Sequence, residues 1–247
     1  LRIDAVMTAS DAERLRHADF AALDAADYAL VERLAREVAL PVPHAASRRH
    51  RPAARGTRLH WTGSFRQASR TGGELLQLRQ LARRQHPLPL LVLADVSGSM
   101  ERYARLLLAF LHAATRGARG RCDVFAFGTR LTDLTPAFRQ ADTDAMLAMA
   151  SQAIADFGGG TRLGDSLATL GQKDGRRLVG ARTVVLVISD GLDTGEPDRL
   201  ARELRWLGLH SGRLLWLNPL LRYSAYQPLA QGAAVLHRHA HAMLAVH

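Results

Sequence analysis

From Pro87 onward, short apolar runs alternate with amphipathic stretches, and this alternation restricts the fold more than any other feature of the chain. Residues 90–94 and 183–188 are mostly apolar runs, as expected of central strands that are buried on both faces. Residues 102–115, after the first run, have a helical period. Strands that alternate with helices form mostly parallel sheets with helices on both faces. The sequence therefore predicts a three-layer, doubly wound α/β domain over residues 87–247.

The remaining elements follow from the same patterns. Residues 121–127 and 130–134 are predicted strands separated only by Gly128 and Thr129, so they should form a hairpin and add one antiparallel edge strand. Near the C-terminus, a turn of helix at 225–229 and a short strand at 233–236 are expected. Further helices are predicted at 142–155, 163–170 and 197–207, and a further strand at 213–217.

The N-terminal part of the chain has a different composition. Residues 1–43 are predicted to be helical, because Ser10 and Glu13 have the spacing of a capping box and residues 22–38 have an amphipathic helical period. Residues 44–86 are rich in arginine and lack a helical period over most of their length. We interpret them as an extended arm or connector, in which residues 74–84 are expected to form a short helix.

The positive charge of the chain lies in this arm. The formal net charge is +10, and residues 44–84 contain ten of the 33 basic residues but only one of the 23 acidic ones, Glu74. Arginine clusters contact phosphates, so a nucleic-acid-binding arm is one hypothesis. Trp61 and Phe65 are its only interleaved aromatic residues, and no recognition helix is visible. Docking on an acidic surface, of the same chain or of a partner, is equally consistent.

The chain has no sequence feature of a membrane or secreted protein. Its longest apolar runs are far shorter than the ~20 residues that a membrane span needs. Its single cysteine, Cys122, excludes an intramolecular disulfide and is typical of the cytoplasm. The chain opens with Leu1 and shows no secretion signal, and we expect the natural N-terminus to lie further upstream.

Three polar segments lie where a doubly wound fold binds its ligands, just past the carboxyl ends of strands. The first is Asp95-Val-Ser97-Gly-Ser99, which follows the first predicted strand. The second is the glycine-rich loop that ends at Thr161, and the third is Ser-Asp-Gly around Asp190. Because these ends meet at one edge of the sheet, the three segments are expected to form one site.

The residue types of this site suit a hard divalent cation. Mg²⁺ prefers oxygen ligands, keeps several waters and takes one or two carboxylates. The site has two carboxylates and three hydroxyls, from Asp95, Asp190, Ser97, Ser99 and Thr161. We expect Mg²⁺, or another divalent cation such as Mn²⁺ or Ca²⁺, with one position open for an acidic side chain of a partner.

Two further aspartates, Asp165 and Asp193, lie close to the site in sequence. Both are expected to orient its loops. The C-terminal His237, His239 and His241 alternate in a predicted strand-like segment, where we favour a solvated, partly structural cluster over a transition-metal site.

The main enzymatic alternative is a phosphohydrolase of the haloacid dehalogenase type, which also places an aspartate after its first strand. That chemistry requires a second carboxylate two residues later as general acid and base. Ser97 occupies this position, and no lysine is well placed to bind a phosphate. A phosphate-binding P-loop is favoured even less, because the glycine-rich loop lacks the Lys-Ser/Thr ending. We therefore expect no enzymatic activity.

The combination of DxSxS, Gly-Gly-Thr and a strand ending in Asp-Gly resembles the metal-ion-dependent adhesion site of von Willebrand factor A (VWA) domains. The resemblance implies that Ser97, Ser99 and Thr161 contact the metal directly. It also implies that Asp95 and Asp190 hold the metal mainly through water.

The similarity extends to the bacterial CoxE-like group of VWA proteins. It is carried by DVSGSMERYARLLLAFLHA, VFAFGTRLTDLT, GGGTRLGDSL, VLVISDG and LLWLNPLLRYSAYQPLA, and by RHADFAAL and TGGE nearer the N-terminus. The resemblance implies an accessory protein that acts with a MoxR-type AAA+ ATPase in the maturation or activation of a client metalloenzyme. A molybdenum hydroxylase such as carbon monoxide dehydrogenase is the example for which the group is named. It also implies a short further segment beyond His247.

Overall fold

The computed structural model describes residues 44–115, 120–155, 159–223 and 226–245. Within them the chain forms two compact units that divide between Leu88 and Pro89. The predicted helical segment 1–43 lies outside the described residues. No helix in the described part of the chain is long and apolar enough to cross a membrane.

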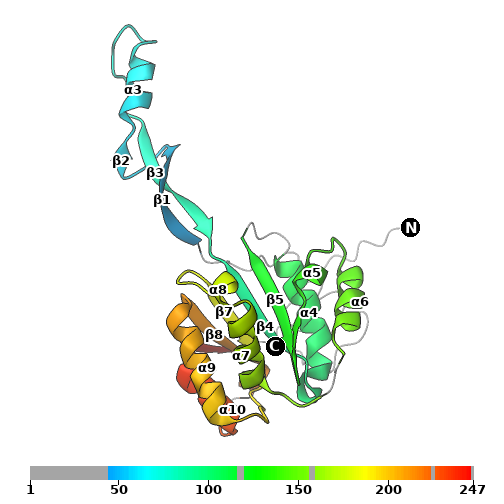
Figure 1. The fold of residues 1–247 in the computed structure, drawn as a ribbon. Helices are drawn as coiled ribbons and strands as arrows, with labels where there is room; N and C mark the ends of the chain where they lie inside the picture. The colour runs from blue at the N-terminus through cyan, green and yellow to red at the C-terminus, as the bar shows by residue number, and fades with distance from the viewer. Residues whose placement is uncertain (1–43, 116–119, 156–158, 224–225, 246–247) are drawn as a thin grey trace, which may run out of the picture. The chain divides into compact units, whose positions relative to one another are not determined.

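The unit that follows Pro89 is built on a six-stranded sheet with the order β6-β5-β4-β7-β8-β9 (Figure 1). All pairs are parallel except β5–β6, in which the edge strand β6 runs antiparallel. The structure thus confirms a mostly parallel sheet with one antiparallel edge strand. The strands are β4 (Leu90–Asp95), β5 (Cys122–Phe127), β6 (Leu131–Asp133), β7 (Val184–Ile188), β8 (Arg213–Asn218) and β9 (Ala242–Ala245).

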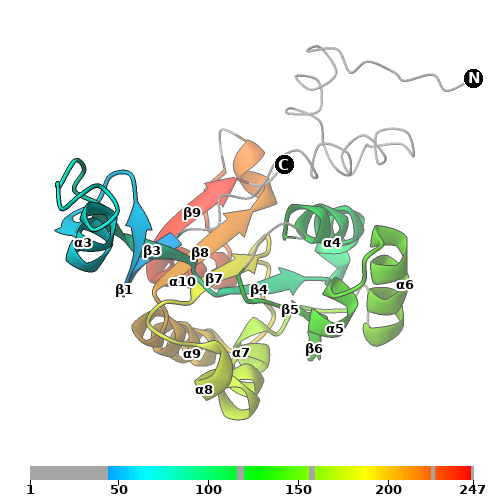
Figure 2. The same ribbon diagram turned by 90° about the horizontal axis from the view of Figure 1, so that it is seen from above.

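Helices cover both faces of this sheet, as Figure 2 shows, with α4 on one face and α7, α9 and α10 on the other. Asp142 caps α6 by accepting a hydrogen bond from the Ala145 N–H at 2.9 Å. The helices are α4 (Glu101–Thr115), α5 (Thr135–Phe138), α6 (Thr143–Ala153), α7 (Leu163–Lys173), α8 (Gly175–Leu178), α9 (Pro197–His210) and α10 (Gln231–His239). Two 3₁₀ turns are η2 (Gly98–Met100) and η3 (Pro219–Arg222).

The apolar runs of the sequence form the core. Leu91 and Leu93 of β4 pack with residues of α7, α9 and α10, while Val92 between them is also fully buried. Because alternate residues of a strand point to opposite faces, a strand that is covered on both sides favours a nearly continuous apolar run. The core ends where Asp95 closes β4.

The order of the strands creates a switch point between β4 and β7. From β4 the chain continues to β5 on one side, whereas β7 is followed by β8 on the other side. In open α/β sheets the crevice at such a point, outside the carboxyl ends of the strands, is where ligands bind. Asp95 and Asp190 lie at these two carboxyl ends.

The unit before Pro89 contains a small antiparallel sheet with the order β1-β3-β2 and one helix. Its elements are β1 (His44–Ala53), β2 (Arg58–Leu59), α3 (Trp61–Ala68) and β3 (Gln80–Pro87). The expected helix at 74–84 is wrong, because residues from Gln80 onward pair with β1 and residues 74–79 are not helical. The backbone N–H and C=O groups of β3 form hydrogen bonds with β1, in place of the hydrogen bonds that they would form within a helix.

The C-terminal prediction was also wrong in detail. Residues 233–236 belong to α10 and not to a strand, and residues 226–229 are not helical. Ala233 and Leu236, three positions apart, are both buried at 1 % exposure on the core side of this helix. The last strand is β9, which pairs with β8.

Candidate metal centre

Three loops meet at the carboxyl ends of β4 and β7. The Gly98 N–H donates to the Gly159 carbonyl at 3.2 Å, which joins the first predicted segment to the glycine-rich loop. The Thr194 N–H donates to the Thr161 carbonyl at 2.9 Å, which joins that loop to the chain after β7. The structure therefore brings together the three segments that the sequence placed at one site.

Asp95 lies at the centre of this arrangement and is 0 % exposed. Its Oδ1 accepts a hydrogen bond from the Ser97 N–H at 2.9 Å, and its Oδ2 accepts one from the Ser189 hydroxyl at 2.7 Å. Burial raises the pKa of Asp95 to about 6, although these hydrogen bonds lower it, and the nearby Asp190 carboxylate adds to the rise. Among the described residues, no basic side chain forms an ion pair with this buried carboxylate.

The other four predicted site residues place further side-chain oxygen atoms on the same three loops. Ser97, Thr161 and Asp190 are buried, at 2–4 % exposure, whereas Ser99 is exposed. The hydroxyls of Ser97 and Ser99 lie 3.3 Å apart, and Asp190 Oδ1 accepts from the Leu192 N–H at 3.0 Å. The set has a buried floor and one side, at Ser99, that is open to solvent.

This donor set fits a hard divalent cation. Two carboxylates and three hydroxyls provide oxygen ligands, and neither Asp95 nor Asp190 forms an ion pair with any residue that the structure describes. A cation would supply the positive charge that the buried Asp95 lacks. No group of three His, Cys, Asp or Glu side chains gathers in the described part of the chain, so the donors do not suit a zinc-type site.

The C-terminal histidines do not form the predicted alternating face. His237 and His239 lie on α10, where residues two positions apart point to nearly opposite sides of the helix. His241 Nδ1 accepts a hydrogen bond from the Leu214 N–H at 3.0 Å and so links the end of α10 to β8. Of the three, His241 therefore has a structural role between α10 and β8.

Two residues that were not predicted as site residues position Asp95 and the loop after β7. The Ser189 hydroxyl donates to Asp95 and accepts from the Gly191 N–H at 3.0 Å. Trp216, which is 0 % exposed, donates from Nε1 to the Ser189 carbonyl at 2.8 Å. Ser189 is visible in the sequence as the residue before Asp-Gly, whereas the Trp216 contact depends on the pairing of β7 with β8.

The two further aspartates hold the loop that contains Thr161. Asp193 Oδ1 accepts from the N–H of Leu163, the first residue of α7, at 3.0 Å, and burial raises the pKa of the Asp193 carboxyl. Asp165 forms ion pairs with Arg162 at 2.9 Å and with Arg199 at 2.7 Å. Both carboxylates thus act on the loops, as expected.

Gly191 provides a test of how tightly the third loop is built. Its φ is +83°, and a Cβ at this position would lie 2.8 Å from the Ala233 Cβ. We expect Gly191→Ala to lower the free energy of unfolding by about 2–3 kcal/mol, because it combines left-handed backbone strain with a clash. Gly208→Ala in α9 is the control, since its Cβ meets nothing within 4 Å. It should raise the free energy of unfolding by about 0.5 kcal/mol. Urea denaturation measures both, and equal effects would contradict this description of the loop.

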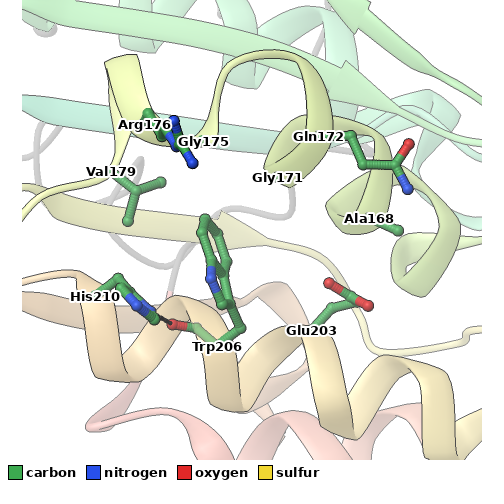
Figure 3. A pocket seen from close by; sticks show the side chains of 9 residues that line it. All are labelled: Ala168, Gly171, Gln172, Gly175, Arg176, Val179, Glu203, Trp206 and His210. Carbon is green, nitrogen blue, oxygen red and sulfur yellow. Dashed lines mark hydrogen bonds between the residues drawn. The ribbon is translucent and has the colours of Figure 1, made fainter.

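A pocket of about 560 Å³ lies between α7, α8 and α9 (Figure 3). Trp206 and His210 stack on its wall with ring centroids 5.0 Å apart. Among the described residues that line it, Glu203 is the only carboxylate and none carries a hydroxyl. The pocket therefore lacks the oxygen donor set of the metal centre and is separate from it.

The sheet order and the three loops at its switch point define a doubly wound α/β domain with its candidate site at the carboxyl ends of the strands. The model of the family described as VWA domain containing CoxE-like protein matches residues 31–247, and the chain belongs to this family. No curated protein matches the chain.

Several solved structures are similar to this chain. One is a von Willebrand factor type A protein from Catenulispora acidiphila, with 16 % identity over 68 % of this chain and 41 % of that one, and a TM-score of 0.47. Proximal thread matrix protein 1 from the mussel byssus has 15 % identity over 64 % and 43 %, with a TM-score of 0.45. BatB from Bacteroides thetaiotaomicron has 13 % identity over 65 % and 90 %, with a TM-score of 0.41. The match thus spans about two fifths of the first two proteins.

Proposed function

We propose that this chain is a metal-dependent protein-binding module without enzymatic activity. In this proposal it holds a divalent cation (Mg²⁺, Mn²⁺ or Ca²⁺) at the edge between β4 and β7 and binds a carboxylate of a partner there. The observation that carries the proposal is the fully buried Asp95, hydrogen-bonded to two of the three loops, beside a hydroxyl-rich donor set that opens to solvent at Ser99.

Each residue has a defined part in this proposal. Ser97, Ser99 and Thr161 would contact the cation directly, and Asp95 and Asp190 would hold it mainly through water. When bound, the cation supplies the positive charge that attracts the partner's carboxylate. Leu192, two residues after Asp190 and 48 % exposed, offers an apolar contact to the same partner.

The enzymatic alternative has no support in the geometry around Asp95. The residue two positions later, Ser97, donates its backbone N–H to Asp95, and its hydroxyl lies beside that of Ser99. A hydroxyl does not exchange a proton near neutral pH as a carboxylate does, so it cannot act as the general acid and base. We therefore propose binding in place of phosphate hydrolysis.

The proposed partners are a MoxR-type AAA+ ATPase and a client metalloenzyme in the cytoplasm, for example a molybdenum hydroxylase such as carbon monoxide dehydrogenase. Membership of the CoxE-like VWA family supports an accessory role and interaction with proteins in general. In our proposal the ATPase supplies the mechanical work, and this chain directs it to the client by binding a carboxylate of one of them.

Binding to the ATPase and to the client of the same organism tests the proposal. We expect one of them to bind the full chain with Mg²⁺ present, and its affinity to fall at least about tenfold in EDTA and in Ser99→Ala. Ser99 is exposed, so this variant should fold normally, and Ser151→Ala on the exposed side of α6 is the matched control. Biolayer interferometry gives the affinities. Equal binding in EDTA, or no loss in Ser99→Ala, would show that the site is not used for adhesion.

The absence of enzymatic activity has its own test. With Mg²⁺ and p-nitrophenyl phosphate, we expect the purified chain to release no more p-nitrophenol than buffer does. Hydrolysis that survives purification and disappears in Asp95→Asn would instead assign the chain to the phosphohydrolases.

A further inference from the structure

The unit before Pro89 carries a strong positive charge that nothing in its own sequence balances. The arm, residues 44–86, makes up most of this unit (Figure 1). All ten of its arginines are exposed, its only acidic residue is Glu74, and none of these arginines forms an ion pair with a residue in the described part of the chain. The arginines are Arg48, Arg49, Arg51, Arg55, Arg58, Arg66, Arg70, Arg79, Arg83 and Arg84.

The same arm exposes an unusual share of large apolar side chains. Of the twelve large hydrophobic side chains that are exposed among the described residues, six lie within residues 59–78. Trp61 and Phe65, one turn apart on α3, are 53 % and 57 % exposed and stack with ring centroids 5.8 Å apart. The other four are Leu59, Leu75, Leu76 and Leu78. Exposed apolar side chains that gather in one region often mark an interaction site, whereas single scattered ones do not.

Hydrogen bonds hold these side chains on a defined scaffold. The Ser64 hydroxyl accepts from the Arg79 N–H at 2.9 Å, and the His60 N–H donates to the Arg79 carbonyl at 2.8 Å. Both bonds fix α3 against the start of β3. A cleft of about 390 Å³ is lined by Leu78 and Arg79 together with residues 52–54. The arm thus offers an apolar and cationic surface on a fixed backbone.

The arm has almost no core of its own. Only Gly63, Ser64 and Ala68 are buried within it, and no residue of β1, β2 or β3 is buried. Small sheets without a packed face are marginally stable in water. Burial of the exposed aromatic and leucine side chains against a partner would contribute about 25 cal/mol per Å² of apolar area.

We propose that the arm binds an acidic segment of a partner protein that also carries apolar side chains. Arginine binds carboxylates through paired hydrogen bonds, and Trp and Arg are the residues that most often dominate protein interfaces. Nucleic acid fits the surface less well. Four of the six exposed apolar residues are leucines, and the inner ring faces of Trp61 and Phe65 are occupied by each other, which leaves only their outer faces for bases. This surface shares no residue with the metal centre and does not depend on its function.

A peptide selection on the full chain tests the proposal. A phage-displayed library of random dodecapeptides is panned on the immobilised protein in EDTA, so that the metal centre does not contribute. We expect the enriched peptides to combine Asp or Glu with Leu, Phe or Trp. Fluorescence anisotropy then gives the affinity of the strongest peptide for the full chain and its variants.

The variants separate the arm from other surfaces. We expect Trp61→Ala/Phe65→Ala and Arg66→Gln/Arg70→Gln each to weaken the peptide at least about tenfold. Leu209→Ala and Leu229→Ala, at exposed leucines of the other unit, should leave its affinity unchanged. Because all four arm residues are exposed, circular dichroism should show an unchanged fold.

Three results would overturn the proposal. The first is enrichment of peptides without acidic residues, or of none. The second is peptide binding that survives both arm variants. The third is binding of a fluorescent dT₂₀ oligonucleotide more tightly than any peptide, with loss in the same variants, which would assign the arm to nucleic acid.

Discussion

Replacement of Asp95 by alanine is expected to abolish the rise in melting temperature that Mg²⁺ causes in the wild-type protein. A ligand that binds only the folded state at about 100 times its Kd stabilises that state by about 2.7 kcal/mol. For a chain of this size, that free energy corresponds to about 5–10 °C. Asp95 is 0 % exposed and hydrogen-bonded to Ser97 and Ser189, so its loss removes both a carboxylate and the link between two loops.

Scanning calorimetry with Mg²⁺ and with EDTA measures this effect. The matched control is Asp144→Ala, which removes an exposed carboxylate from the first turn of α6, away from the three loops. The control should keep the full rise. A rise in Asp95→Ala equal to that of the wild type would contradict the placement of the cation.

Trp216→Ala should produce the largest loss of stability among the variants considered. The side chain is 0 % exposed in the core that α7, α9 and α10 cover, and truncation of such a residue costs about 3–5 kcal/mol. The truncation also removes the hydrogen bond from Nε1 to the Ser189 carbonyl, which fixes the residue that donates to Asp95. We expect urea denaturation to show the loss.

Trp216→Phe separates the hydrogen bond from the packing. It keeps most of the ring, so the free energy of unfolding should fall by about 1–2 kcal/mol, the contribution of one buried hydrogen bond and a small cavity. If Trp216 positions Ser189, this variant should also bind Mg²⁺ less tightly by calorimetric titration. Unchanged Mg²⁺ affinity in a folded Trp216→Phe protein would show that the residue only packs.

The sheet could be predicted from the sequence because its strands are buried on both faces. Such strands consist mostly of apolar residues, so residues 90–94 stand out without knowledge of their neighbours. The hairpin of β5 and β6 was also predictable, since the two strands follow each other closely in the chain. Local patterns are sufficient where burial or a short connection determines the structure.

The metal centre could be predicted in part for the same reason. Asp95, Ser97 and Ser99 share one tight loop, and the carboxyl ends of parallel strands meet at the same edge of the sheet. The hydrogen bond that positions Ser189, which donates to Asp95, could not be predicted. The contact of Trp216 with Ser189 depends on the register that places Ile188 opposite Leu217, and no local pattern contains that register.

The predictions for residues 74–84 and 233–236 were wrong because long-range contacts override local periodicity. Leu75, Leu78 and Leu81 have the three-residue spacing of a helix, yet the chain from Gln80 onward pairs with β1, more than twenty residues away. The short apolar run at 233–236 could not be distinguished from a strand by periodicity alone. In the structure this run lies in α10, where Ala233 and Leu236 pack in the same core as residues of α9.

The central claim, that the edge between β4 and β7 holds one divalent cation, is tested most directly by titration of the full chain with Mn²⁺, followed by electron paramagnetic resonance. We predict one saturable Mn²⁺ site per chain, which Mg²⁺ displaces and which is absent when Asp95 and Asp190 are both replaced by asparagine. The absence of a saturable site in the wild-type chain, or a site that survives in the folded double variant, would contradict the claim.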